Sequence, residues 1–314
     1  MSTRLLVGTR GSQLALRQTH LIVAMLQERE PDLTCDIVEI ATHGDRFRET
    51  PIQEMGAEVD RGIFNTALEQ AVLRGEVDLA TCSFKDVESR LPEGLAAVSV
   101  GPREDPHDAL VSRHNGPLAA LPEGAVLATS SPRRVSQLAA FRPDFRFEAL
   151  RGNVTTRALR DRERFDGVIL AAAGLRRLGL ERQITEVVPE SILLPAPAQG
   201  ALGCEYAVGR EDVARRIRAI QDAPTERCVR LEKALLVRLS GGCFAPVGIL
   251  ARETPQGGLE IQCRIAALDG SRSIDERVTG PHTHGAELLA TLGDRVLRAG
   301  GRELVDAARA RLQG

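Results

Sequence analysis

The chain has 314 residues, of which 43% are hydrophobic, and its 41 basic and 43 acidic residues give a formal net charge of -2. This length exceeds what one hydrophobic core usually holds, so we expect two or three packed domains. The balanced charge gives no indication of binding to nucleic acid or to an anionic membrane. No run of about 20 apolar residues is present, and the first strand follows the amino terminus without a secretory hydrophobic segment, so we expect a cytoplasmic protein.

Cysteine and lysine are the most informative residue types in the composition. The six cysteines are far apart, with no Cys-x-x-Cys pair and no Cys and His spacing typical of zinc sites. We therefore predict reduced thiols, most of them buried like small hydrophobic residues, and no metal site. Lys85 and Lys233 are the only lysines in the sequence. A lysine retained in such an arginine-rich chain can be needed for its compact ammonium group, or its retention can be chance.

Strand and helix patterns alternate along the first half of the chain, which is typical of α/β layers around a mostly parallel sheet. The expected strands are 5–9, 34–42, 77–82, 97–100 and 109–112, and apolar residues at helical spacing predict helices over 12–30 and 63–74. A second α/β block is expected after Pro122-Glu123-Gly124. Its strands are 125–129, 145–150 and 167–172, and its helices begin near Pro132 and Asn153.

The second half of the chain begins with an irregular segment, 195–200, whose two prolines and glycine predict a hinge or linker. A helix over 225–239 then precedes Ser240-Gly241-Gly242-Cys243. The remaining expected elements are the strands 247–251, 259–267 and 273–278 and the helices 286–298 and 302–312. Strands followed by helices are typical of a small α+β domain. The sequence therefore predicts two α/β domains and a third, smaller α+β domain.

Arginine recurs where a predicted strand ends and a helix begins. Arg10 and Ser12 follow the first strand, and Arg133 and Arg134 follow Ser131, the expected N-cap of a helix in the second block. Unpaired N–H groups at helix starts attract anions. Consecutive arginines are about 100° apart around a helix and can grip two different carboxylates.

A third junction of this kind runs from Arg151 to Arg157, with Asn153 as the expected cap and Gly152 allowing close approach of a ligand. A single arginine at a helix start is also typical of a solvated surface. Three topologically similar junctions instead predict a ligand that carries several negative charges.

Lys85 and Asp86 follow a buried-looking strand and therefore lie at its carboxyl end, where open α/β sheets place their sites. An ion pair there offers a carboxylate to a cationic intermediate and an ammonium to a substrate acid group. The same pair also fits a surface salt bridge of about 0–1 kcal/mol.

The Ser240-Gly241-Gly242-Cys243 sequence follows a predicted helix. Two glycines let the chain turn and leave the next side chain unobstructed, so the Cys243 thiol can stand in a cleft as a nucleophile or attachment point. A helix C-cap followed by a small buried residue explains the same pattern.

Eight segments carry specific combinations of residues, namely GTRGSQLA (8–15), SFKDV (83–87), REDP (103–106), TSSPRR (129–134), LRGNV (150–154), ILAAAGL (169–175), QGA (199–201) and GGCxxPVG (241–248). Together they resemble the porphobilinogen deaminase family, in order and over nearly the whole chain. The resemblance implies two domains similar to periplasmic binding proteins, with a cleft between them, and a third domain that carries the cofactor cysteine. The implied boundaries are 1–103 with 198–220, then 104–197, then 221–314.

The resemblance also implies the activity: four porphobilinogen molecules are condensed head to tail with loss of ammonia, and hydroxymethylbilane is released by hydrolysis. Cys243 would hold a dipyrromethane through a thioether, and the enzyme would make this cofactor from its own substrate. Asp86 matches the catalytic carboxylate that contacts pyrrole N–H groups and stabilises the azafulvenium cation. Members of the family are mostly monomers, and motion about the 195–200 segment would accommodate the growing chain.

The remaining implied site residues bind the acid groups of cofactor and substrate. The cofactor set is Cys243, Lys85, Asp86, Ser131, Arg133 and Arg134, and the substrate set is Arg10, Ser12, Arg151, Asn153, Arg157 and Gln199.

The sequence departs from the family pattern at several positions. Cys82, Glu88 and Ala128 stand where the family usually has histidine, proline and glycine, and the 50–64 loop is more acidic, with Arg61 as a candidate replacement for a lysine. A second hypothesis is a non-enzymatic two-domain binding module for a small polyanion. It explains the arginines at helix starts, but it gives no reason for the Gly-Gly-Cys loop or for a third domain.

Overall fold

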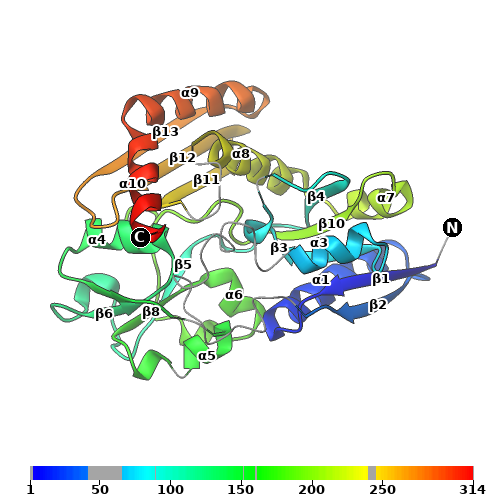
Figure 1. Cartoon of the computed structure of the whole chain (residues 1–314), viewed down its shortest axis with the longest axis horizontal. Helices are drawn as coiled ribbons and strands as arrows, with labels where there is room; N and C mark the ends of the chain where they lie inside the picture. The colour runs from blue at the N-terminus through cyan, green and yellow to red at the C-terminus, as the bar shows by residue number, and fades with distance from the viewer. Residues whose placement is uncertain are drawn as a thin grey trace. The chain divides into compact units, whose positions relative to one another are not determined.

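The computed structural model describes residues 3–41, 66–88, 90–150, 152–159, 161–239 and 245–313 (Figure 1). The predictions made for the 50–64 loop, Arg151 and Cys243 lie outside these residues. The chain forms two compact units: unit 1 is Met1–Glu104 with Gly200–Arg227, and unit 2 is Asp105–Gln199 with Cys228–Gly314. The finer division into three domains at the boundaries given above stays a prediction.

Unit 1 is built on a five-stranded sheet with the order β2-β1-β3-β10-β4. Its strands are β1 (Arg4–Thr9), β2 (Thr34–Glu39), β3 (Leu79–Ser83), β4 (Leu95–Val100) and β10 (Leu202–Ala207). β1 pairs in parallel with β2 and β3, whereas β10 is antiparallel to both β3 and β4.

Helices cover both faces of this sheet because its strands bury alternate side chains on opposite sides. The helices are α1 (Gln13–Arg29), α3 (Thr66–Leu73) and α7 (Glu211–Ala219), with a short 3-10 helix η3 (Phe84–Asp86). Ile22 of α1 shares one core with Leu5, whereas Leu68 of α3 belongs to a second core, to which the next residue of β1, Leu6, also contributes.

Unit 2 contains a second five-stranded sheet, with the order β7-β6-β8-β5-β9. Its strands are β5 (Asp108–Val111), β6 (Val126–Ala128), β7 (Arg146–Glu148), β8 (Gly167–Ala171) and β9 (Glu186–Val187). Its helices are α4 (Pro132–Phe141), α5 (Val154–Leu159) and α6 (Ala172–Arg177), with 3-10 turns η4 (Leu118–Ala120), η5 (Asp161–Glu163) and η6 (Glu181–Gln183). β6 is parallel to β7 and β8, and β5 is antiparallel to β8 and β9.

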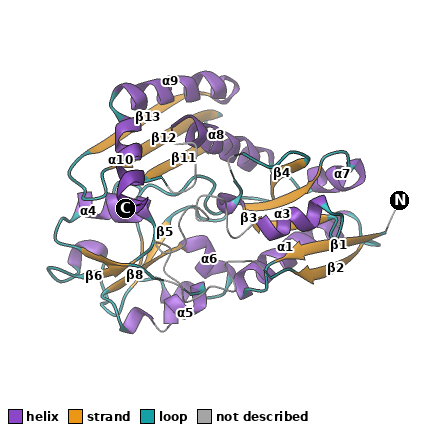
Figure 2. Ribbon diagram, in the orientation of Figure 1, coloured by secondary structure: helices purple, strands orange, loops and turns teal. Residues whose placement is uncertain are grey.

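The carboxyl-terminal part of unit 2 is an antiparallel sheet covered by helices (Figure 2). Its strands are β11 (Val247–Glu253), β12 (Gly258–Ala266) and β13 (Ser273–Pro281), and its helices are η7 (His282–His284), α9 (Gly285–Arg298), α10 (Gly301–Gln313) and α8 (Ala223–Leu239), of which the residues up to Arg227 belong to unit 1. Leu235, Ile261, Leu292 and Val305 belong to its core. The predicted fold class, two α/β sheets with a smaller α+β part, is confirmed.

Each of the two larger sheets contains one antiparallel strand that follows a crossing of the chain between units. β5 starts soon after the crossing at Glu104–Asp105, and β10 starts soon after the crossing at Gln199–Gly200. The first residue of β5, Asp108, pairs with Ala171 at the end of β8, and the first residue of β10, Leu202, pairs with Ser83 at the end of β3. Both crossings therefore lie at the carboxyl edges of parallel strands, where α/β sheets place their sites.

Two elements of unit 1 were not expected from the sequence, β10 and α7. The β10 segment contains Gly203 and the fully buried Glu205, and neither residue is typical of a strand. Among the described helices, none has both the length and the apolar composition needed to cross a membrane.

Candidate functional site

Arg10, Ser12, Lys85 and Asp86 lie at the same edge of the sheet in unit 1. β1 and β3 run in parallel with Gly8 opposite Ala80, so the residues that follow each strand emerge together. Ser12 is the N-cap of α1, and its hydroxyl accepts a hydrogen bond of 3.3 Å from Ala15 N. The prediction of a helix start behind Arg10 is confirmed.

A chain of buried hydroxyl groups holds this edge together. Thr19 Oγ1 of α1 lies 2.7 Å from Thr9 Oγ1 of β1 and 2.7 Å from Thr81 Oγ1 of β3, so these hydrogen bonds join the three elements. Gln18 Nε2 donates to Ser83 Oγ at 2.9 Å, at the end of β3. Buried hydrogen bonds of this kind fix the backbone from which Lys85 and Asp86 project.

Lys85 and Asp86 follow the buried Phe84 on the short η3 turn. Lys85 is half-buried and Asp86 is exposed. Phe84 N donates to Ala201 O at 3.0 Å, which ties the turn to the segment entering β10. A methyl group added at Gly203 of β10 would lie 2.6 Å from Phe84 Cδ2. The turn that carries Asp86 is therefore packed directly against β10.

Glu69 of α3 is a buried acid that the sequence did not reveal, with 3% of its surface exposed. Burial, and secondly the nearby carboxylate of Glu88, raise the pKa of Glu69 from 4.5 to about 7. Burial also raises the pKa of Glu88. Glu88 stands where the family pattern has proline, so this interaction arises from one of the departures noted above.

Three helix starts gather at the carboxyl edge of the sheet in unit 2, because β6, β7 and β8 are parallel. Ser130 joins the first two junctions: its Oγ accepts from Leu150 N at 2.9 Å and donates to Leu150 O at 2.8 Å. Asn153 Oδ1 accepts from Thr156 N at 2.7 Å, which confirms Asn153 as the cap of α5. Arg157 is half-buried on α5, and its predicted neighbour Arg151 lies outside the described residues.

Ser131 occupies the N-cap position of α4 and Pro132 is the first helical residue, as predicted. The Ser131 side chain, however, makes no capping hydrogen bond. Its half-buried hydroxyl is therefore not used to complete the helix start.

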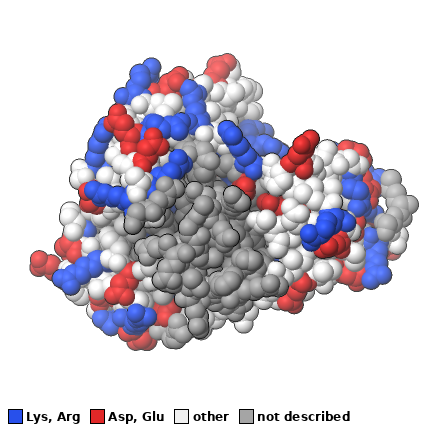
Figure 3. Space-filling view, in the orientation of Figure 1, with Lys and Arg blue, Asp and Glu red and all other residues white. Residues whose placement is uncertain are grey.

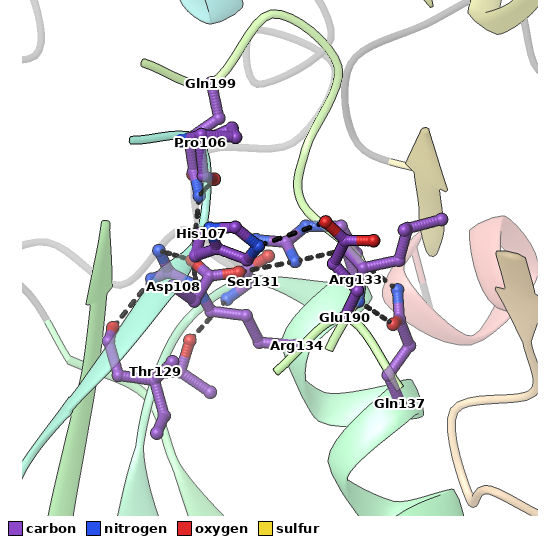
Figure 4. A network of polar contacts seen from close by, with 12 residues as sticks. Pro106, His107, Asp108, Thr129, Ser131, Arg133, Arg134, Gln137, Glu190 and Gln199 are labelled. Carbon is purple, nitrogen blue, oxygen red and sulfur yellow. Dashed lines mark hydrogen bonds and ion pairs between the residues drawn. The ribbon is translucent and has the colours of Figure 1, made fainter. Parts of the chain in front are cut away.

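Arg133 and Arg134 point into the protein and both bind Asp108 (Figure 4). Arg133 Nη1 lies 2.7 Å from Asp108 Oδ2, and Arg134 Nη2 and Nε lie 2.6 and 3.0 Å from Asp108 Oδ1. The exposed fractions of the two arginines are 3% and 8%. Both arginines thus hold one buried carboxylate of the protein, and the expected grip on two different ligand carboxylates stays a prediction.

The cluster of Asp108, Arg133 and Arg134 is strongly coupled and carries one excess positive charge. Burial by itself raises the pKa of Asp108, but the two guanidinium groups outweigh it and hold that pKa well below its usual value. Nε of Arg133 is buried and has no hydrogen-bond partner among the described residues. The Arg133 Nε–H group can therefore donate to an acceptor that is not among the described protein atoms.

Gln199, predicted to contact substrate, lies in the same network with 1% of its surface exposed. Its Nε2 donates to Pro106 O at 2.7 Å and to Asp108 Oδ1 at 3.1 Å. The amide nitrogen of Gln199 is therefore engaged within the protein, and its contact with the substrate stays a prediction. Sequence reasoning also missed Asp108, although an acidic residue directly before the apolar run 109–111 was a usable signal.

Cys243 lies outside the described residues, so its predicted role is not tested by the fold. The residues on either side are placed: α8 ends at Leu239 and β11 begins at Val247. Of the described cysteines, Cys82, Cys204, Cys228 and Cys263 are buried and Cys35 is half-buried. In the described ranges no group of three or more His, Cys, Asp or Glu side chains could hold a metal ion. On the face drawn in Figure 3, basic and acidic side chains of the described residues are interspersed.

Two family models match this sequence. "Porphobilinogen deaminase, dipyromethane cofactor binding domain" matches residues 5–215, and "Porphobilinogen deaminase, C-terminal domain" matches residues 226–297. The chain belongs to the porphobilinogen deaminase family. Curated porphobilinogen deaminases are similar over nearly their whole length: one from Geobacter sp. (strain M21) is 42% identical over 95% of this chain and 93% of its own. Another, from Desulforudis audaxviator, is 42% identical over 99% of both chains.

The chain is also similar, at lower sequence identity, to two solved structures. A putative lipoprotein from Actinomyces odontolyticus has 13% identity and a TM-score of 0.43, over 71% of this chain and 92% of its own. The periplasmic VFT2 domain of Bordetella pertussis BvgS has 15% identity and a TM-score of 0.41, over 69% of this chain and 86% of its own.

Proposed function

We propose that the protein is a hydroxymethylbilane synthase, a transferase that condenses four porphobilinogen molecules head to tail on a covalently bound dipyrromethane. Each condensation releases ammonia, and hydrolysis then frees hydroxymethylbilane. The observation that carries this proposal is the match to both porphobilinogen deaminase family models, with relatives 42% identical over 93–99% of their own length.

The residues present fit a dipyrromethane, which carries several carboxylates. At the start of α4, Ser131 has a hydroxyl that makes no capping bond, and the buried Nε of Arg133 has no partner among the described residues. The first-turn N–H groups and the excess positive charge of the cluster around Asp108 favour an anion at the same place. Bound through Cys243, this group supplies the primer pyrrole to which substrate is added. We assign Lys85, Ser131, Arg133 and Arg134 to its acid groups.

Asp86 is the proposed catalytic residue. Its carboxylate is exposed on a turn held by Phe84, at the carboxyl edge of β3. When ammonia leaves porphobilinogen, positive charge develops on the substrate, and a fixed carboxylate nearby lowers the energy of that state. Because the turn is anchored to Ala201 and packed on Gly203, little rearrangement is needed during the reaction.

Arg10, Ser12, Arg151, Asn153 and Arg157 are assigned to the acid groups of the substrate and the growing chain. Every added pyrrole brings two more carboxylates, so a product of four units requires several cationic or N–H donor groups. Strand-to-helix junctions in both units supply such donors. We further propose that the enzyme acts as a monomer in the cytoplasm, with no nucleic acid or membrane partner.

The mass of the intact protein tests this function. The purified protein should exceed its sequence mass by two linked pyrroles, and Cys243→Ser should remove the excess and the activity together. Incubation with porphobilinogen should release ammonia. An unmodified protein with full activity would contradict the proposal, and retention of porphobilinogen without ammonia release would favour the binding-module hypothesis instead.

A further inference from the structure

We propose that Asp108 is a positioning residue that fastens the first turn of α4 to both segments by which the chain enters and leaves residues 105–199. This inference rests on the proposed function, because it assigns to Asp108 the placement of an anion-binding helix start. Asp108 itself is fully buried, and both of its carboxylate oxygens are bound by protein groups.

The entering segment meets α4 through the carboxylate of Asp108. Asp108 is the first residue of β5, four residues after the crossing at Glu104–Asp105. Both of its oxygens are bound by arginines of the first turn of α4. Arg134 Nη1 also donates to Ile169 O at 2.7 Å, so the end of β8 is held by the same group.

The leaving segment is attached to the same carboxylate. Arg133 Nη1 donates to Leu194 O at 2.8 Å, and Gln199 Nε2 reaches both Pro106 O and Asp108. Gln137, on the next turn of α4, adds a further tie by accepting from Leu194 N at 2.7 Å. The segment 195–200, predicted to be a hinge, is thus tied to α4 directly at Leu194, the residue before it, and through Asp108 at Gln199.

Removing the charge of Asp108 would leave two buried guanidinium groups without their shared counterion. Unpaired buried charges are strongly unfavourable, so the arginines would rotate towards water or recruit other acceptors. Either response moves the α4 first turn relative to β8 and to the crossing segments. Asp86 lies on η3 of unit 1, whereas Asp108 belongs to unit 2. The α4 start is assigned to the acid groups of the dipyrromethane, so this change should misplace the primer pyrrole that porphobilinogen must meet, and KM should rise more than kcat falls.

The test is a comparison of KM and kcat for porphobilinogen in the full-length holoenzyme. Asp108→Asn should raise KM about tenfold or more, with kcat reduced less than threefold. Gln199→Met removes the amide bonds to Pro106 O and Asp108 and keeps the two ion pairs, and it should raise KM about threefold. Each variant is assayed at a temperature at which circular dichroism shows it folded, and its pyrrole content is checked by mass.

Asp166→Asn is the matched control, because Asp166 also binds an arginine, Arg113, and a backbone N–H, that of Val126. Asp166 precedes the start of β8, whereas Asp108 pairs with the last residue of β8, Ala171. At about 3.3 Å per residue along β8, Asp166 and Asp108 therefore lie roughly 16 Å apart. KM values for Asp108→Asn and Gln199→Met within twofold of the control would overturn the proposal. If Asp108→Asn does not fold, the KM of Gln199→Met decides alone. A wild type that releases no ammonia would instead refute the proposed function.

Discussion

Asp86 is the residue whose charge the proposed chemistry depends on most directly. Replacing it with Asn keeps the shape of the side chain but removes the fixed anion, so the rate should fall by about 10²–10³-fold. The turnover rate measured by ammonia release checks this. Asp32→Asn, at an exposed position after α1, is the matched control and should leave the rate unchanged. A rate for Asp86→Asn within tenfold of wild type would remove Asp86 from its catalytic role.

The pH dependence that Glu69 gives to the free energy of unfolding is opposite in sign to that of an acid paired with a base. The folded protein keeps the Glu69 proton up to a pKa of about 7, whereas the unfolded chain releases it near 4.5. The folded state therefore binds more protons between these values, and the free energy of unfolding falls as pH rises through this window. Glu69→Gln should remove this loss and make the protein about 1–2 kcal/mol more stable at pH 8 than wild type, with little difference at pH 4.

Thermal unfolding of wild type and Glu69→Gln at pH 4, 6 and 8 measures this difference. Glu28→Gln, an exposed acid on α1, serves as the control for a general change of net charge. Parallel pH profiles for wild type and Glu69→Gln would show that Glu69 is ionised in the folded protein.

At the scale of elements, the packing of β10 against η3 sets the position of the Lys85-Asp86 turn. Gly203→Ala would place a methyl group 2.6 Å from Phe84 Cδ2 and 3.2 Å from Cys82 Sγ, so these side chains must move. Overpacking of this kind costs about 1–3 kcal/mol. The variant should unfold at a lower temperature and also lose activity, because Phe84 immediately precedes Lys85. Gly116→Ala, which meets only Ala120 Cβ at 3.4 Å, should do neither. Unchanged kcat in a destabilised Gly203→Ala would separate the turn from catalysis.

The elements that the sequence predicted well are those whose pattern is local. Alternating and helical apolar spacing gave β1, α1 and the three strands of the carboxyl-terminal sheet to within a few residues, and Asn153 was recognised as a cap from residue type alone. β10 was missed because its strand character comes from two neighbours, β3 and β4, that are distant in the chain. Long-range pairing can make a strand of a segment with weak propensity.

The candidate site was predicted in its location but not in its internal contacts. Residue type and strand-end position identified Arg133 and Arg134, yet their direction depends on Asp108, which comes from another strand. The sequence could not reveal that one carboxylate binds both arginines. Gln199 was assigned to the substrate from the family resemblance, which does not reveal that its amide nitrogen donates to Pro106 and Asp108 inside unit 2.

For the whole molecule, pairing of carboxylates with arginine and histidine predicts sensitivity to acid. The described carboxylates of the 105–199 segment with lowered pKa are Asp105, Asp108, Asp144 and Asp166. The hydrogen bond from Arg142, aided by that from Gly124 N, lowers the pKa of Asp144 to about 2. A lowered pKa stabilises the folded state above the unfolded value of about 3.9, and this contribution is lost as pH falls towards 2.

Asp144→Asn should therefore unfold at a lower temperature than wild type at pH 6, and the difference should disappear near pH 2. Thermal unfolding scans between pH 2 and 6 measure it, and Asp32→Asn is again the control. A difference that stays constant over this range would mean that the ion pair with Arg142 does not contribute.

The position of β10 between β3 and β4 also has a consequence for synthesis on the ribosome. The first sheet lacks a central strand until residue 207 has left the exit tunnel, although its other strands are complete by residue 100. Until then β3 and β4 lack their shared partner strand, and the unpaired backbone groups of such strand edges favour aggregation. The first sheet therefore stays incomplete while about a hundred further residues are translated.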